Sequence, residues 1–379
     1  MSKGTLEIVN ATLQIAKEES DRRAKSIEAK AKETLGELDG QATFLVSRIP
    51  EDDVHELASN PTLRSELSKL ARRIDGFETN RLIFQETPEL TPHILFIRGM
   101  DFHFNQNFEG SLASWKQVVV DKESSDELKS LAWYWMGREQ NNLAKFEEAE
   151  QSFANARRSA SAVMDFELQR NILESKFFNK DKGKAADLIE PLQKLLNRVA
   201  PGGDANGSSV SRVRGKVLTT LGNVRIEAGD ECGGAGSQEA RDHYESALDI
   251  FEQARDQDKW ALFGKAEALY SLGRFDEAYP IYRDKLRRQA VDEYHRRVEP
   301  RARTVARTLE LICCIRVPDL WKDVPTASEN VLASLDEVDE NLTVYSEIWH
   351  RNVSKPRFRG QIEQLMREWE ERRSQPPTA

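Results

Sequence analysis

The fold is decided by two stretches of equal length, LFIRGMDFHFNQNFEGSLASWKQV at residues 95–118 and WYWMGREQNNLAKFEEAEQSFANA at residues 133–156. In each stretch a glycine, Gly99 or Gly137, is followed at offsets 9, 12, 16 and 19 by a large, a small, a large and an apolar residue. A small residue lets two antiparallel helices cross closely, and bulky side chains beside it fill the groove. The spacing therefore predicts two helix–turn–helix pairs.

Weaker copies of this pattern follow along the chain. Gly222 begins one copy, but its small residue, Ala240, comes 18 positions later rather than 12, which we assign to an enlarged glycine-rich loop at residues 229–237. Ala266 begins another copy, in which three of the four offsets recur. Residues 166–196 have the apolar spacing of paired helices without the glycine and aromatic residues. About five helix pairs are therefore expected.

This spacing resembles the tetratricopeptide repeat (TPR), in which a large and a small residue of a first helix receive a small and an aromatic residue from a second. The resemblance covers about residues 92–290. It implies an all-α fold, a right-handed superhelical solenoid of antiparallel helix pairs, with extra helices at both ends. It also implies a scaffold for protein–protein interaction, whose first helices line a concave groove.

The segments outside the repeats are also predicted to be helical. Residues 1–40 form one long helix with a thin apolar stripe, which either packs on the body of the protein, the favoured interpretation, or pairs with a second chain. The stripe consists of Ala16, Ser20, Ala24, Ile27, Ala31, Leu35 and Leu38. The expected order is a helical extension at 41–91, a TPR-like array at 92–316 ending in a helix at 291–316, and capping helices within 317–379 at about 327–350 and 358–373.

Composition restricts the classes of partner. The formal charge of −9 disfavours a general nucleic-acid role, because the field of the whole molecule repels phosphate backbones. The sequence contains no uncharged apolar run of about 18 residues, so no membrane segment is expected. Three cysteines, Cys232, Cys313 and Cys314, form no CxxC motif, which fits a reducing compartment. We expect a cytoplasmic protein whose oligomeric state is open.

Sequence motifs for catalysis are missing. The six histidines show no HExxH or other short metal-ligand spacing, and the glycine-rich loops at 201–209 and 229–237 lack the lysine of a phosphate-binding loop. We therefore expect no enzyme, no cofactor and no metal, and a role as an adaptor or regulatory subunit that binds a partner peptide or helix.

Residues for partner binding follow from the repeat positions, because first-helix side chains that do not face the second helix are the ones expected to line the groove. This lining is rich in the rigid aromatic side chains that serve as interface anchors. The alternative, equally weighted, is that the terminal helices of the same chain fold back and cover these aromatics. The predicted partner-binding residues are His93, Phe96, Met100, His103, Phe104, Tyr134, Trp135, Arg138, Asn142, Asn223, Trp260 and Phe263.

A basic segment at residues 283–307 supports a second hypothesis. It carries nine arginine and lysine residues against four acids, so it could hold an acidic partner, a nucleotide or RNA despite the overall charge. A sensor or nucleic-acid-associated scaffold is thus the alternative function. Its predicted anion-binding residues are Arg287, Arg288, Arg296, Arg297, Arg301 and Arg303.

Overall fold

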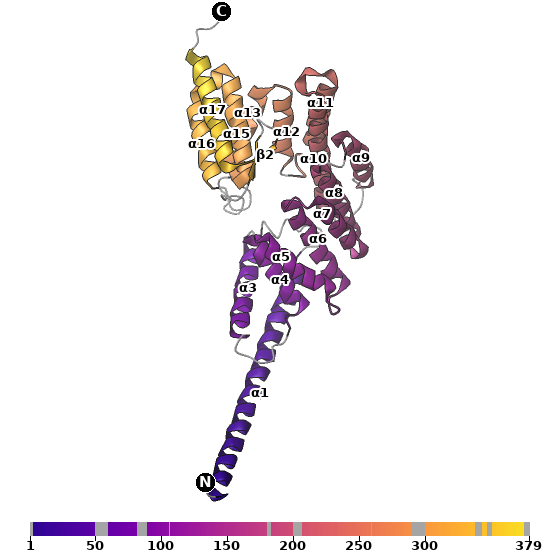
Figure 1. The fold of residues 1–379 in the computed structure, drawn as a ribbon. Coiled ribbons are helices and arrows are strands. Elements are labelled where there is room, and N and C mark those ends of the chain that lie inside the picture. Colours follow the sequence, from indigo (N-terminus) through magenta and orange to yellow (C-terminus); the bar gives the residue numbers. More distant parts are fainter. Residues whose placement is uncertain are drawn as a thin grey trace, which may run out of the picture. The chain divides into compact units, whose positions relative to one another are not determined.

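The structure is a computed structural model, and it divides into two units, Met1–Ser175 and Lys176–Ala379 (Figure 1). It describes residues 3–49, 60–81, 89–105, 107–179, 183–199, 207–258, 260–289, 300–337, 343–346 and 351–374. The first unit contains α1 (Lys3–Ser47), α3 (Pro61–Arg81), α4 (Pro92–Phe104), α5 (Phe108–Val120), α6 (Asp126–Asn142), α7 (Phe146–Ala156), the 3-10 turn η1 (Arg157–Ser159) and most of α8 (Ala162–Phe178).

The predicted glycine and aromatic pairs interlock the helices of the first unit. A Cβ atom added at Gly99 of α4 would lie 2.2 Å from Nε1 of Trp115 on α5, and one added at Gly137 of α6 would lie 2.7 Å from the ring of Phe153 on α7. Both rings are fully buried. Only glycine admits the neighbouring ring at these crossings, so the helix pairs α4–α5 and α6–α7 are confirmed.

The helices before the repeats pack onto the first repeat. Both α1 and α3 contact α4. In the same way, α4 and α5 of the first repeat both contact α6 of the next. The C-terminal part of the α1 stripe, from Ala31 through Leu35 and Leu38, is buried in the same core. The prediction of packing on the body is therefore confirmed for this part, and the helix continues to Ser47 rather than ending near residue 40.

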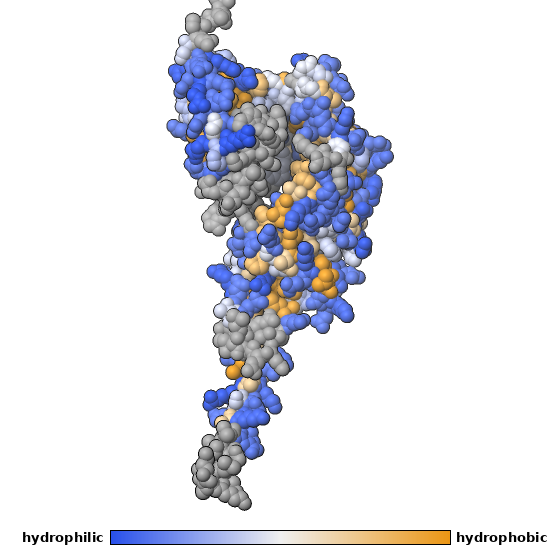
Figure 2. Space-filling view, viewed as in Figure 1, coloured by the Kyte–Doolittle hydropathy of each residue, from blue (hydrophilic) through white to orange (hydrophobic). Residues whose placement is uncertain are grey.

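The preceding part of α1 makes no such contact. Ile15 is 64% and Ile27 is 46% exposed, and Ala16, Ser20 and Ala24 are exposed as well. Figure 2 shows that the surface of this stretch is predominantly hydrophilic. The thin stripe predicted from the sequence thus buries only its C-terminal half within this chain.

The second unit is also built from helices that pack in chain order, α10 on α11, α11 on α12 and α12 on α13. Its elements are η3 (Ala185–Leu188), α9 (Ile189–Arg198), α10 (Gly207–Glu231), η4 (Gly234–Gly236), α11 (Gln238–Ala254), α12 (Ala261–Ser271), α13 (Phe275–Gln289), α15 (Pro300–Arg316), η5 (Pro318–Asp323), α16 (Val324–Asp336), β1 (Thr343–Ser346), β2 (Arg351–Ser354) and α17 (Lys355–Ser374).

The hairpin of α10 and α11 corrects the predicted loop at 229–237. Here α10 continues to Glu231 and α11 begins at Gln238, so part of the predicted loop belongs to α10 and the connection itself is shorter than predicted. Gly229 makes this possible, because a Cβ atom there would lie 2.5 Å from the ring of Tyr244 on α11. Gly222 faces a different ring, that of Phe251, which lies about two helical turns after Tyr244 on α11.

Phe251 is shared by two helix crossings. A Cβ atom at Gly222 of α10 would lie 2.5 Å from its ring, and one at Gly264 of α12 would lie 2.3 Å from it. Two glycines on different helices thus receive the same buried side chain.

The C-terminal segment departs from the predicted helix at 327–350: α16 ends at Asp336, the prediction is wrong at Thr343–Ser346, and residues 338–342 and 347–350 lie outside the described residues. Strands β1 and β2 follow α16 and pair antiparallel, with Thr343 opposite Ser354. Thr, Val and Tyr favour a pleated backbone, which explains the change. This hairpin is the exception, among the residues that the structure describes, to the all-α, TPR-like class, which is otherwise confirmed. The last predicted helix is confirmed as α17.

Candidate functional site

Five predicted groove residues belong to the core instead. Phe96, Met100, Phe104, Tyr134 and Trp135 are between 0% and 8% exposed. Their helices α4 and α6 are covered on one side by the preceding helices and on the other by the following ones, so these positions lie between packed helices. Their prediction as open groove lining is corrected for this reason.

The remaining predicted residues stay accessible to different degrees. In the first unit, Asn142 is exposed and His93, His103 and Arg138 are half-buried. His93 lies 3.8 Å from Asp39 of α1 through its Nδ1 atom. The second unit places Asn223, Trp260 and Phe263 at half-buried positions. Phe263 stands edge-on to Tyr282, with ring centroids 5.9 Å apart. Partner binding by these residues remains a prediction.

A buried acid joins two first helices of the first unit. Glu139 of α6 is fully buried, and its carboxylate contacts Nδ1 of His103 on α4. Asn142 donates from Nδ2 to the other carboxylate oxygen of Glu139 at 3.1 Å. The His103 ring also packs on Trp135, with centroids 4.9 Å apart. The exposed amide of Asn142 is therefore held in place by the buried carboxylate of Glu139.

A second polar cluster, the Arg170 network, lies on α8. Arg170 is 5% exposed and donates from Nη2 to Glu167 at 3.1 Å and to Asn171 at 2.8 Å. Its Nη1 atom lies 3.0 Å from the carboxylate of Glu174. Burial by itself would lower the pKa of Arg170, but the carboxylates of Glu167 and Glu174 outweigh burial and hold that pKa above its usual value. The guanidinium is thus a permanent buried charge.

Tyr134 and Arg138 connect the two clusters on α6. Burial of the Tyr134 phenol raises its pKa to about 12, with Arg138 opposing and Glu167 adding to the shift. The guanidinium of Arg138 lies 5.2 Å from the ring centroid of Trp135. Together, α4, α6 and α8 carry the polar face of the first unit, which we define as His103, Arg138, Glu139, Asn142, Glu167, Arg170, Asn171 and Glu174.

The buried phenol gives a test of this packing. Unfolded Tyr134 ionises near pH 10, while the folded phenol keeps its proton to about pH 12. The contribution of the protonated Tyr134 phenol to the free energy of unfolding is therefore fully present below about pH 10. It is lost as the pH rises to about 12, and the total loss is about 2–3 kcal/mol. We expect urea unfolding across this range to show a steeper loss of stability in the wild type than in Tyr134→Phe. Equal slopes for the two proteins would contradict the burial of this hydroxyl.

A cavity of about 240 Å³ lies beside the starts of the same first helices. Its walls come from the end of α1, from His93 of α4, from Ser125 and Leu131 near the start of α6, and from Ser161 and Met164 near the start of α8. The serines at 125 and 161 already cap their helices through the amides of Leu128 and Met164. The cavity is thus a recess in the first unit, and two of its serine hydroxyls are engaged in helix capping.

The basic segment receives no support from the part of the chain that the structure describes. Arg296 and Arg297 lie outside the described residues, and Arg287, Arg288, Arg301 and Arg303 lie in helices without described side chains. At the two ends of the segment, Arg283 stacks over Tyr279 at 5.3 Å and Arg307 donates to the carbonyl of Asn330 at 2.8 Å. Anion binding there stays a prediction.

The adjacent cysteines belong to the core of the second unit. Cys313 and Cys314 are fully buried, and burial raises the pKa of Cys314 to about 12. A thiol that keeps its proton is a poor nucleophile, so this pair behaves as the small apolar residues that the sequence suggested.

Comparison with known proteins gives structural similarity only. No family model and no curated protein matches the chain. Among solved structures, it is similar to the assembly chaperone of RpL4, Acl4, at 14% identity over 75% of this chain and 100% of that one, with a TM-score of 0.41. The Rap conjugation gene regulator of the plasmid pLS20 has 12% identity, coverage of 89% and 97%, and a TM-score of 0.44. A Rap protein complexed with Competence and Sporulation Factor has 14% identity, coverage of 89% and 99%, and a TM-score of 0.43.

The interlocked glycine and aromatic pairs define the class of protein. The chain is a TPR-like helical-repeat protein with additional helices at both ends. None of its described helices combines the length and the apolar character needed to span a lipid bilayer.

Proposed function

We propose that the protein is a non-catalytic scaffold that binds an extended segment of a partner protein on the polar face of the first unit. The observation that carries this proposal is the burial of three charged side chains, Glu139, Glu167 and Arg170, on neighbouring first helices at 0% to 5% exposure. Replacing such groups by apolar residues is often neutral or stabilising, so fold stability alone does not explain them.

The buried charges orient the side chains that reach the surface. Glu139 holds the exposed amide of Asn142, and the Arg170 network holds Glu174, whose side chain is 29% exposed. Arg138 lies over the Trp135 ring. An amide, a cation and a carboxylate held on rigid helices can pair with the peptide groups and charges of an extended segment at low entropic cost.

The test removes the surface groups and leaves the buried ones. We expect the double variant Arg138→Glu, Asn142→Ala to bind its co-purifying partners at least tenfold more weakly than the wild type, a difference of about 1.4 kcal/mol or more. The matched control is Lys116→Glu, Gln117→Ala, which makes the same kind of change at two exposed positions of the second helix α5. Circular dichroism checks that both variants are folded.

Quantitative mass spectrometry of the captured proteins decides the outcome. Partners lost by the first variant and retained by the control support the polar face. Retention of every partner at wild-type strength by Arg138→Glu, Asn142→Ala would overturn the proposal.

A further inference from the structure

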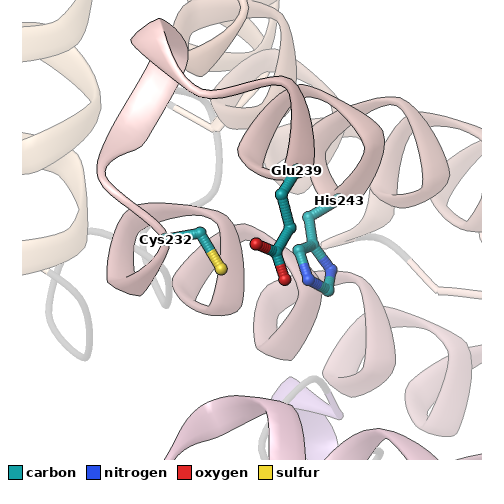
Figure 3. Close-up of side chains that lie close together, drawn as sticks. All are labelled: Cys232, Glu239 and His243. Carbon is teal, nitrogen blue, oxygen red and sulfur yellow. The ribbon is translucent and has the colours of Figure 1, made fainter.

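Three side chains that can ligate a metal ion meet at the closed end of the α10–α11 hairpin. Cys232, Glu239 and His243 each offer a ligand atom, and these atoms all lie within 4.8 Å of one another. Figure 3 shows the Glu239 carboxylate between the Cys232 sulfur and the His243 ring. All three belong to the second unit, and none of them is part of the polar face defined in the first.

Local geometry brings the three residues together. Glu239 and His243 are four residues apart on α11, so they lie one above the other on the same side of the helix. Cys232 follows the last residue of α10, and its amide donates to the carbonyls of Ala228 and Gly229 at 3.1 Å. The chain then reverses through Gly233 and Gly234, whose φ values of +97° and +69° favour glycine.

The set of ligands indicates the class of ion. A thiolate sulfur, an imidazole nitrogen and a carboxylate oxygen are the three types of protein ligand that zinc accepts, whereas magnesium and calcium prefer oxygen alone. Three protein ligands leave the fourth tetrahedral position for water or for a partner's side chain. We propose that Cys232, Glu239 and His243 form a binding site for a zinc-like divalent transition-metal ion.

The surroundings permit an ion to enter. Glu239 is exposed, and Cys232 and His243 are half-buried, so the cluster opens to solvent on one side. On binding, the thiol of Cys232 releases its proton to water, and the thiolate and carboxylate together balance the two charges of the ion.

Arg225 is the feature that opposes binding. Its Nη1 atom lies 3.3 Å from Nδ1 of His243, which leaves Nε2 as the ring nitrogen for the ion. A guanidinium at this distance repels a dication, and its donated hydrogen bond competes with the proton that Nδ1 carries in a metal-bound imidazole. Removal of the Arg225 charge should therefore tighten binding.

The ion would tie the end of α10 to α11. Because binding of a ligand to the folded state stabilises that state, the unfolding temperature of the second unit should rise with zinc concentration. This role is independent of partner binding by the first unit, so either proposal can fail without the other.

Cobalt(II) titration of the reduced full-length chain tests the site. Thiolate-ligated tetrahedral cobalt gives a sulfur-to-metal charge-transfer band and intense visible bands, and zinc should displace both. We expect one cobalt ion per chain. The affinity for cobalt should be at least 100-fold weaker in Cys232→Ser and in His243→Gln, since even the loss of a group that only orients a ligand costs about 10–100-fold. Arg225→Gln should bind cobalt more tightly than the wild type. The control Glu245→Gln changes an exposed carboxylate of the same helix and should bind as the wild type does.

Circular dichroism of the same samples shows whether each protein is folded, so a loss of metal binding can be distinguished from unfolding. A folded wild-type chain that gives no thiolate band would refute the site. A band that persists in Cys232→Ser would assign the metal to another cysteine and refute it equally. A Glu245→Gln variant as weak as Cys232→Ser would show that the ion binds the exposed acids of α11 without a defined site.

Discussion

Trp115→Ala is expected to lower the free energy of unfolding of the first unit by about 3–5 kcal/mol, because a fully buried indole is removed from between two helices. Gly99→Ala is expected to lower it by about 2 kcal/mol. A Cβ atom at Gly99 would lie 2.2 Å from the Trp115 ring nitrogen, which donates to the carbonyl of Phe96 at 3.2 Å. The added methyl group overpacks the crossing and displaces the ring, which destabilises the fold and weakens this hydrogen bond. The higher helix propensity of alanine offsets about 1 kcal/mol of this loss.

The two changes should be strongly coupled, since one ring causes both effects. In a Trp115→Ala background, Gly99→Ala should be neutral or stabilising by up to about 1 kcal/mol. Gly76→Ala is the control, because nothing lies within 4 Å of a Cβ atom at this helical position of α3, and it should also stabilise. Urea unfolding followed by circular dichroism measures the four variants and the wild type. Additive effects of the two substitutions would contradict the interlock.

Arg170→Leu is expected to destabilise the first unit by about 3–5 kcal/mol. Glu167 is 2% exposed, and the change leaves its carboxylate buried without the guanidinium that neutralises it. Glu167→Leu should destabilise less than Arg170→Leu, because Arg170 keeps the carboxylate of Glu174 at 3.0 Å from its Nη1 atom. The double variant Arg170→Leu, Glu167→Leu should be more stable than Arg170→Leu, because it no longer holds the buried Glu167 carboxylate without its cation.

An exposed pair on α9 provides the control for this cycle. The side chains of Lys194 and Glu190 lie 2.7 Å apart but are 72% and 75% exposed, so Lys194→Leu should change stability by no more than about 0.5 kcal/mol. Guanidinium chloride would screen these charges, so the measurement should use urea. An Arg170→Leu variant as stable as Lys194→Leu would show that Arg170 is solvated rather than buried.

The repeats were predictable from the sequence because their packing is encoded locally. Gly99 and Trp115 are 16 residues apart, as are Gly137 and Phe153, and each pair needs only its own hairpin to meet. The extended hairpin was not predictable in the same way. Glycines at 229, 233, 234 and 236 look alike in the sequence, yet Gly229 lies inside a helix and Gly233 and Gly234 form the turn.

Burial of the proposed groove was one of two alternatives that the sequence left open, because it depends on distant segments. Whether Phe96 and Met100 face solvent is decided by α1 and α3, which begin many residues earlier and carry no recognisable motif. The Arg170 network did have a local signal, since Glu167, Arg170 and Glu174 follow the i, i+3 and i+7 spacing of one helix face. The metal-ligand cluster escaped a search for HExxH and CxxC motifs, because its cysteine stands across a turn from the helical Glu239 and His243.

The Phe251 ring packs against a glycine of α10 and a glycine of α12, so two neighbouring repeats depend on the same side chain. Neither helix can separate from α11 without exposing the same aromatic side chain and emptying the recess that it fills on the other. In a linear array, where each repeat touches only the next, such a shared element raises the coupling between neighbours relative to the stability of each alone. Melting of this part of the chain is therefore expected to proceed through α10, α11 and α12 together.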